Sequence, residues 1–304
     1  MWRKTFILHN KCSQWRQSGK FPKIGTGRFY PMEKRIVIIK IKKMETKFSL
    51  KNKGVIITGG ASGIGKSIVA TFAKQGAEVH VLDFNLNDLN GLTEDCSNEG
   101  FKIFAHHCDV SNSQKVTELI SQINTNSSID VLVNNAGVAH VGNIENCDEN
   151  DLDRLYNINI KGVFNCSKAC IPLMKNNGGG VILNIASIAS TVGISDRFAY
   201  SMSKGAVLTM TYSIAKDYIN DNIRCNCISP ARVHTPFVDN FIKKNYPGKE
   251  KEMFEKLSKS QPIGRMGNPQ EIADLALFLC ADEASFITGS NYGIDGGYVT
   301  LNSK

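Results

Sequence analysis

The chain has 304 residues, a formal net charge of +8 and nine cysteines. Residues 1–43 contain twelve Lys or Arg and one acidic side chain, so residues 44–304 hold 24 basic and 27 acidic side chains, a formal charge of −3. Because the positive charge is confined to this leader, the rest of the chain offers no basic field for nucleic acid or for a membrane surface.

The basic leader, residues 1–43, contains a short apolar run at residues 36–39. This run is too short to span a bilayer. The leader also lacks the apolar core and cleavage site of a secretion signal, and it is poorer in serine than a transit peptide. We therefore expect it to be disordered or to precede the true start at Met44. We expect one domain over residues 44–304, because strand and helix patterns alternate from Phe48 onward.

The first predicted strand, residues 54–57, leads into a glycine-rich turn at residues 58–65 that opens a helix. The glycines permit a tight turn and a close approach of the backbone to a pyrophosphate at the helix N-terminus. The second predicted strand, residues 78–82, ends at Asp83, eighteen residues after Gly65. A carboxylate there can accept hydrogen bonds from both ribose hydroxyls and repels a 2′-phosphate, which favours NAD over NADP. The alternative role for this carboxylate is to cap the following helix.

Two further predicted strands, residues 103–108 and 131–133, are followed by Asp109 and by the sequence Asn-Asn-Ala-Gly at residues 134–137. Ligands bind at the carboxyl ends of the strands in open α/β sheets, so these residues are candidate ligand contacts. The alternative is that they are ordinary turn residues, since Asn, Asp and Gly are common in turns.

The fifth apolar run, residues 181–185, predicts a buried strand that brings the hydroxyl of Ser187 to the same end of the sheet. Thirteen residues later, Tyr200 and Lys204 lie four apart on one face of the helix predicted at residues 200–219. A free phenol has a pKa of about 10, and a nearby cation favours its phenolate form. Tyr200 is therefore a candidate general acid/base. The alternative is a half-buried Tyr beside a solvated Lys.

The cysteines show no Cys-x-x-Cys pair. Cys225 and Cys227 share a strand face, and Cys166 and Cys170 share a helix face, but neither pair has matching His ligands. We expect reduced, buried thiols, no bound metal and a cytoplasmic location.

The order of these motifs, from the glycine turn to Ser229 and Pro230, resembles the short-chain dehydrogenase/reductase family over about residues 48–302. The resemblance implies an α/β fold with a single Rossmann-type, doubly wound parallel sheet of about seven strands and helices on both faces. The family usually has Pro-Gly where this chain has Pro230-Ala231, so the backbone there lacks the freedom of glycine.

The resemblance also assigns a catalytic tetrad. Ser187 is expected to orient the substrate oxygen, and Tyr200 to move its proton. Lys204 is expected to bind the nicotinamide ribose and to lower the phenol pKa. Asn159, which by itself would be an amide inside the helix predicted at residues 147–174, is expected to hold a water for proton relay. The implied cofactor contacts are Gly59, Ser62, Gly63, Ile64, Gly65, Asp83, Asp109, Val110, Asn135, Ala136, Gly137, Tyr200, Lys204, Pro230, Val233 and Thr235.

Three side chains are candidate substrate contacts. Arg197 lies three residues before Tyr200, and Arg suits a carboxylate. The alternative is a surface Arg that pairs with Asp196. Arg232 falls in the segment that covers the nicotinamide, and it contacts a carboxylate or the pyrophosphate, or forms a salt bridge in the lid. His140 follows the Asn-Asn-Ala-Gly turn, and the alternative for it is a structural role. The charged amphipathic segment at about residues 236–262 is similar to the family's mobile substrate lid.

The chain looks most like the branch that acts on sugars or sugar acids of the fucose or 2-keto-3-deoxy-fuconate type. We expect an NAD-dependent oxidoreductase for a secondary alcohol or ketone, and Arg197 favours an acid. The alternatives are a free-sugar dehydrogenase, a 3-oxoacyl thioester reductase and a non-catalytic dinucleotide sensor. Family members use helices at residues 147–174 and 200–219 and the end at 287–304 to assemble, which implies a homotetramer with a small-molecule substrate.

Overall fold

The computed structural model describes residues 47–97 and 100–301. The expected leader, the expected start at Met44 and the last three residues of the expected assembly segment lie outside these ranges. Within them, every helix is either too short or too polar to cross a bilayer.

Seven strands form one sheet in which every pairing is parallel. Their order across the sheet is β3-β2-β1-β4-β5-β6-β7, so the prediction of a doubly wound parallel sheet is confirmed. The strands are β1 (Gly54–Thr58), β2 (Glu78–Asp83), β3 (Ile103–His107), β4 (Val131–Asn134), β5 (Gly180–Ile185), β6 (Ile223–Pro230) and β7 (Asn291–Ile294).

The central strands are apolar at successive positions because both faces of the sheet are covered. In β1 all five residues are buried. Val55 and Ile57 belong to the hydrophobic cluster on one face, and Ile56 belongs to the cluster on the other. A continuous β-branched run, rather than an alternating one, is therefore what this strand requires.

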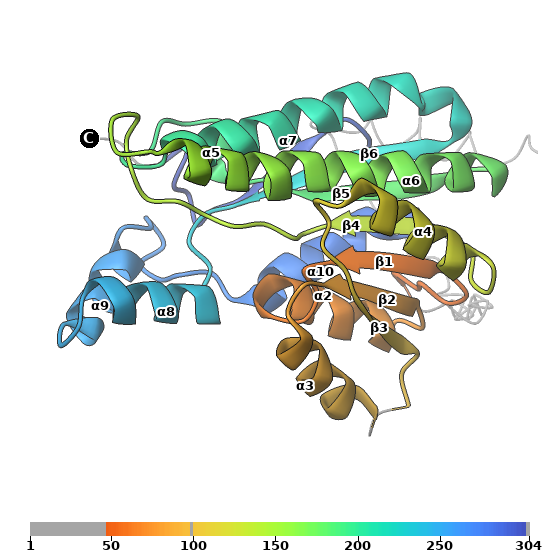
Figure 1. Ribbon diagram of the computed structural model, residues 1–304, viewed down its shortest axis with the longest axis horizontal. Helices are drawn as coiled ribbons and strands as arrows, with labels where there is room; N and C mark the ends of the chain where they lie inside the picture. Colours follow the sequence, from red (N-terminus) through yellow and green to blue (C-terminus); the bar gives the residue numbers. More distant parts are fainter. Residues whose placement is uncertain (1–46, 98–99, 302–304) are drawn as a thin grey trace, which may run out of the picture. The chain divides into compact units, whose positions relative to one another are not determined.

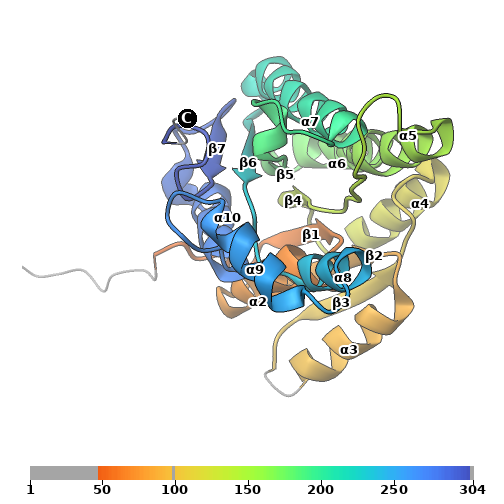
Figure 2. The same cartoon turned by 90° about the vertical axis from the view of Figure 1, so that its left-hand side faces the viewer.

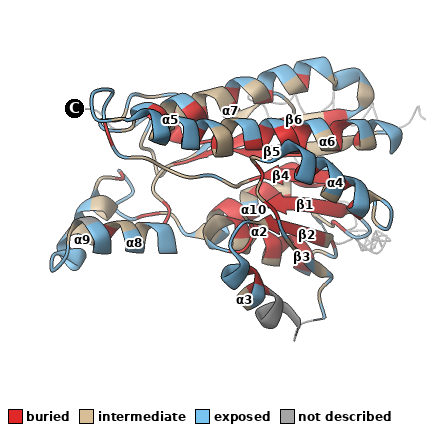
Figure 3. Cartoon of the chain, viewed as in Figure 1, coloured by how far each residue is buried: buried red, intermediate tan, exposed pale blue. Residues whose placement is uncertain are grey.

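Helices pack on both faces of the sheet, with the buried strands between them (Figures 1 and 3). One face is covered by α2 (Gly63–Lys74), α3 (Leu86–Ser97) and α10 (Pro269–Cys280). The other is covered by α4 (Ser113–Asn124), α6 (Gly162–Asn176) and α7 (Phe198–Asp217). Within residues 47–97 and 100–301 there are also short 3₁₀ turns at Ile188–Ser190, Ile219–Asp221 and Asp282–Ala284.

The helix predicted at residues 147–174 has three parts. It begins as α5 (Glu149–Leu155), passes through a π-helical stretch at Tyr156–Lys161 and continues as α6. Asn159 lies in the π-helical stretch, and such stretches are frequent at functional sites.

Two helices lie beyond the carboxyl ends of the strands, α8 (Pro236–Asn245) and α9 (Glu250–Lys259) (Figures 1 and 2). They fall inside the segment predicted as a lid. The order of the strands reverses between β1 and β4, so the loops after these two strands diverge and leave a crevice at the same end of the sheet.

Candidate active site

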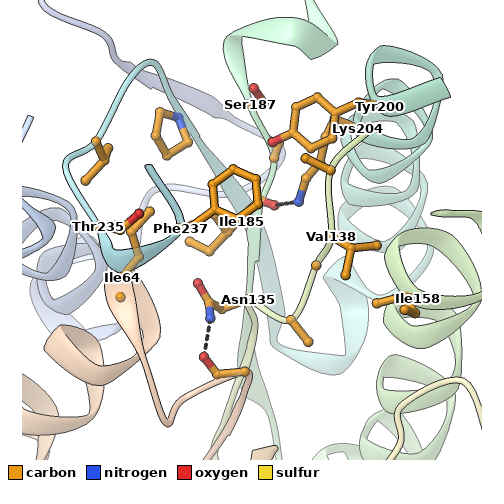
Figure 4. A pocket seen from close by; sticks show the side chains of 18 of the residues that line it. Ile64, Asn135, Val138, Ile158, Ile185, Ser187, Tyr200, Lys204, Thr235 and Phe237 are labelled. Atoms are coloured by element: carbon orange, nitrogen blue, oxygen red, sulfur yellow. Dashed lines mark hydrogen bonds between the residues drawn. The ribbon is translucent and has the colours of Figure 1, made fainter. Parts of the chain in front are cut away.

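A cavity of about 800 Å³ opens at the carboxyl ends of the strands. Side chains from the glycine turn, the loop after β4, the end of β5, the start of α7 and the segment after β6 line it (Figure 4). Segments far apart in the sequence therefore meet in one place.

The glycine-rich turn forms the floor of the cavity and fits an anionic group. Gly59 has a φ of 62°, and a Cβ atom on it would lie 2.8 Å from the Cα of Ala136. Ser62 precedes α2 without capping it through its side chain, so amide groups of the first helical turn are open to a ligand. Ser62, Gly63 and Ile64 line the cavity, which suits the pyrophosphate of a dinucleotide.

Gly65 does not line the cavity. A Cβ atom on it would overlap the carbonyl oxygen of Gly59, so this glycine lets α2 begin close against the turn.

Asp83, at the end of β2, is held by two backbone amides. Its Oδ2 accepts a hydrogen bond from the amide of Ala61 at 3.0 Å, and its Oδ1 accepts one from the amide of Asn85 at 3.0 Å. The carboxylate therefore ties the glycine turn to β2 and lines the cavity. Asp109 lines the same region, with its Oδ1 accepting a hydrogen bond from the amide of Ser111 at 2.9 Å.

The loop after β4 is bound tightly to the loop after β1. The amide nitrogen of the Asn135 side chain donates to the carbonyl of Gly59 at 2.7 Å, a bond visible in Figure 4. The hydroxyl of Thr58 accepts from the backbone amides of Asn135 and Ala136 at 3.1 and 3.0 Å. Asn135, Ala136, Gly137 and Val110 line the cavity, so the Asn-Asn-Ala-Gly sequence both ties two strands together and faces the ligand space.

Three predicted catalytic side chains line one end of the cavity (Figure 4). Ser187 and Tyr200 lie close enough for Ser187 to lower the pKa of the phenol. The amine of Lys204 donates to the carbonyl of Ile185 at 2.7 Å, at the end of β5. Strand β5 and helix α7 thus bring a hydroxyl, a phenol and an amine together.

Burial sets the protonation of this group. It raises the pKa of Tyr200, while the hydrogen bond from Ser187 and the charge of Arg197 lower it. Burial also lowers the pKa of Lys204 to about 8. Ser187 and Arg197 therefore lower the pKa of Tyr200 in this structure, and the effect of Lys204 on the phenol stays a prediction.

Asn159 is fully buried behind the cavity wall. Its Oδ1 accepts from the amide of Val138 at 2.8 Å, and its Nδ2 donates to the carbonyl of Val138 and to the hydroxyl of Ser203, each at 2.9 Å. A Cβ atom on Gly137 would lie 3.3 Å from Asn159 Oδ1 and 3.4 Å from Lys204 Nζ. Asn159 therefore lies close to Lys204 and anchors the loop after β4.

The segment after β6 faces the glycine turn. A Cβ atom on Gly63 would lie 3.5 Å from Cγ2 of Thr235, and Pro230, Val233 and Thr235 all line the cavity. Among the described non-glycine residues, those with left-handed backbone are Phe48, Asn52, Asp196 and Asn222, so Ala231 adopts its position without needing the freedom of glycine.

Of the three candidate substrate residues, two line the cavity and one does not. Arg197 and Arg232 line the cavity. His140 lies outside the lining and pairs with Asp151, at 3.3 Å between Nε2 and Oδ2. The guanidinium of Arg197 donates to the backbone carbonyl of Asp196 at 3.0 Å and not to its carboxylate.

Several lining residues were not indicated by the sequence patterns. Phe84 directly follows Asp83, and Tyr298 follows the turn after β7, so their neighbours in the sequence could have pointed to them. Val141 and Ile194 come from loops without a pattern, and only the folded chain brings them to the cavity.

Within the described residues, seven cysteines are free, and six of these are buried. That part of the chain also contains no group of three or more His, Cys, Asp or Glu side chains placed to hold a metal.

The family profile described as enoyl-(acyl carrier protein) reductase matches residues 59–299. The chain is similar to the 2-keto-3-deoxy-L-fuconate dehydrogenase of Xanthomonas campestris pv. campestris, with 35% identity over 250 residues, 82% of this chain and 81% of that protein. It is also similar to the 3-oxoacyl-[acyl-carrier-protein] reductase of Thermotoga maritima, with 36% identity over 82% of this chain and 99% of that protein. The crystal structure of L-sorbose reductase from Gluconobacter frateurii, complexed with NADPH and L-sorbose, superimposes with a TM-score of 0.80 and 27% identity over 84% of this chain and 100% of that one.

Proposed function

Because this chain belongs to the short-chain dehydrogenase/reductase family, whose members are NAD(P)-dependent oxidoreductases that act on alcohols or ketones, we propose that it is an NAD-dependent dehydrogenase for a small hydroxy acid or sugar acid. The observation that carries the choice of an acid is Arg197, a guanidinium in the catalytic cavity that has no carboxylate partner among the described residues.

The chemistry follows from the side chains that line the cavity. A bound nicotinamide cofactor would exchange a hydride with the carbon that bears the substrate oxygen. Ser187 holds that oxygen through its hydroxyl, and Tyr200 takes the hydroxyl proton during oxidation or returns it during reduction. Burial raises the pKa of Tyr200, and Ser187 and Arg197 partly offset that rise. In this proposal Lys204 contacts the cofactor ribose, and Asn159 fixes the loop beside it.

Asp83 supports NAD over NADP. Its carboxylate is fixed by the amides of Ala61 and Asn85 and lines the cavity at the end of β2. A 2′-phosphate placed there would meet a negative charge, whereas ribose hydroxyls would find an acceptor. Phe84, the next residue, supplies no cation to receive a phosphate.

We further propose that the protein is a homotetramer that works in the cytoplasm. Apolar side chains exposed on α6 and α7 and near the end of the chain support assembly, and free, buried cysteines suit a reducing compartment.

The test of the proposed function is steady-state turnover of the purified protein with NAD and with NADP. The substrates are pairs of a free sugar and its aldonic or 2-keto-3-deoxy acid. We expect NAD to be preferred and the acid to be oxidised faster than the neutral sugar. In Arg197→Ala, kcat/KM for the acid should fall by about 10- to 100-fold, because a hydrogen bond to a charged group is lost, with little change for the sugar.

Equal or faster turnover of the neutral sugar by the wild-type protein would instead make this a free-sugar dehydrogenase. A Tyr200→Phe variant as active as the wild type would contradict the proposed proton transfer.

A further inference from the structure

Two arginines that are remote in the sequence lie at the catalytic end of the same cavity. Arg197 immediately precedes α7, three residues before Tyr200. Arg232 comes two residues after the end of β6, which is the neighbour of β5 in the sheet. Both side chains are half-buried, and both line the cavity.

The charges that line the cavity are separated along it. Its acidic residues, Asp83 and Asp109, follow β2 and β3 on one side of the sheet. Its arginines are found toward the other side. One of these, Arg154, is neutralised by the carboxylate of Asp151 at 3.1 Å.

Neither Arg197 nor Arg232 has an ion pair within the part of the chain that the structure describes. Arg232 donates from Nε to the hydroxyl of Ser260 at 3.1 Å, and Arg197 donates from Nη1 to a backbone carbonyl. Burial lowers the pKa of Arg232, and the positive charge of Arg197 lowers it further. The two guanidinium groups are therefore like charges that repel each other in a partly desolvated space, and their hydrogen-bond acceptors there are neutral. An anion bound between them would stabilise this arrangement.

We propose that Arg197 and Arg232 bind one and the same substrate carboxylate, so that Arg232 is a second residue that determines specificity for acids. This inference rests on the proposed function for the identity of the reaction, and it adds the shared anion site. A carboxylate has two oxygens and about four acceptor positions, enough for both guanidinium groups. The Nη groups of Arg232 make no hydrogen bond within the described residues, so they can turn to the ligand.

The position of the pair also limits the substrate. Arg197 and Tyr200 are about one helical turn apart, so the carboxylate and the reacting carbon belong to the same short end of the molecule. Arg232 is hydrogen-bonded to the end of the lid, because Ser260 directly follows α9 and accepts from Arg232 Nε, and the side chain of Gln261 accepts from the amide of Arg232 at 3.5 Å. A carboxylate bound between the two arginines therefore links the start of α7 to the lid.

The experiment is a double-mutant cycle that needs no turnover. The melting temperature of the full chain is measured with increasing lactate, malonate or the neutral lactamide. The proteins are the wild type, Arg197→Ala, Arg232→Ala and the double variant. Arg265→Ala removes an exposed guanidinium outside the cavity and serves as the matched control. The transition without ligand shows whether each variant folds, and Arg232→Lys restores a charge if Arg232→Ala does not fold.

For a shared site we expect lactate to stabilise the wild type and the Arg265→Ala control, and lactamide not to do so. Each single variant should weaken lactate binding by about 10- to 100-fold, and the double variant should weaken it little more than either single variant. If the losses of lactate affinity in the two single variants multiply in the double variant, and malonate binds more tightly than lactate, the arginines form two separate anion sites and the proposal is overturned.

The kinetic counterpart separates this inference from the proposed function. If Arg232→Ala raises only the KM for NAD and leaves the KM for the acid unchanged, Arg232 contacts the cofactor and the shared site is wrong, while the proposed function stands. If one lactate binds to both arginines of the wild type, as the non-additive losses would show, but the protein oxidises no acid, the shared site stands and the proposed function is wrong. An absence of any lactate effect on the wild-type melting temperature would also overturn the shared site.

Discussion

Lys204 lies with its amine 2.7 Å from the carbonyl of Ile185 and is only 6% exposed. Burial lowers its pKa to about 8, whereas a free Lys has a pKa of about 10.4. The folded state thus holds the proton less tightly than the unfolded state. Below pH 8 both states are protonated and the whole cost of burial is present. As the pH rises from 8 toward the unfolded pKa, the unfolded state binds more protons, so the stability of the fold increases.

We expect Lys204→Met to be inactive and yet more stable than the wild type at pH 7. The cost of the buried ammonium is at most about 3 kcal/mol from the pKa difference. The substitution removes this cost, but it also removes the hydrogen bond to Ile185, which takes back about 1 kcal/mol of the stability gained. Melting temperature measured from pH 7 to 10 checks this, with Lys216→Met, an exposed position on the same helix, as control. A variant that melts no higher than the wild type at pH 7, or that keeps its full advantage at pH 10, would contradict the burial cost.

At the scale of elements, the sheet could be predicted from the sequence because β1, β4 and β5 are mostly apolar runs with Gly, Asn or Ser at or just after their ends. Positions that are fixed by tertiary contacts could not be predicted from the sequence. The π-helical stretch around Asn159 goes with hydrogen bonds from its side chain to Val138 on the loop after β4. His140 turns to Asp151, and Arg232 approaches Arg197 only because β5 and β6 are neighbours. No local pattern carries that information, so the candidate residues could be named but not arranged.

The N-terminus of helix α10 is stabilised by side-chain hydrogen bonds in its first turn. Asn268 and Glu271 form a capping box, in which Glu271 Oε2 accepts from the amide of Asn268 at 2.8 Å. The same carboxylate accepts two hydrogen bonds from Arg265, each at 2.8 Å. The side-chain hydrogen bonds of Arg265 and then the Asn268 amide lower the pKa of Glu271 to about 2. Since α10 packs against α2, these bonds also support the layer beside the glycine turn.

We expect Glu271→Ala to lower the melting temperature by about 2–4 °C, as the loss of a helix cap does in a domain of this size. Glu271→Gln keeps an acceptor for the Asn268 amide and removes the ion pair, so its loss should be smaller. Because the folded pKa is depressed, the contribution of Glu271 is present above its ordinary pKa and is lost as the pH falls toward 2. Urea unfolding at pH 7 and at pH 3.5 should show the gap between wild type and Glu271→Gln narrowing in acid. A gap that is constant or wider at pH 3.5 would show that the ion pair does not stabilise the helix.

At the scale of the whole molecule, large apolar side chains are exposed at many positions of the described surface, among them positions on α6 and α7 and positions on either side of β7. Phe164 on α6 and Tyr212 on α7 are 50% and 43% exposed, on helices whose outward faces are pale blue in Figure 3. Phe286, just before β7, is fully exposed, and Leu301, after that strand, is 67% exposed. Exposed apolar side chains gathered on particular faces are typical of interfaces between subunits. Two such faces on one chain support a dimer of dimers.

We expect light scattering on a sizing column to give the mass of four chains for the wild type. Phe286→Glu should yield dimers, because a charge replaces the apolar side chain at one interface and leaves the α6 and α7 faces intact. Phe164→Glu should also break the tetramer, through the other interface, and the double variant should be monomeric. Phe237→Glu changes a side chain that is 60% exposed on α8, an element that belongs to neither proposed interface, and should remain tetrameric. A wild-type protein of monomer mass, or tetramers that persist in both single variants, would show that these apolar faces do not join subunits.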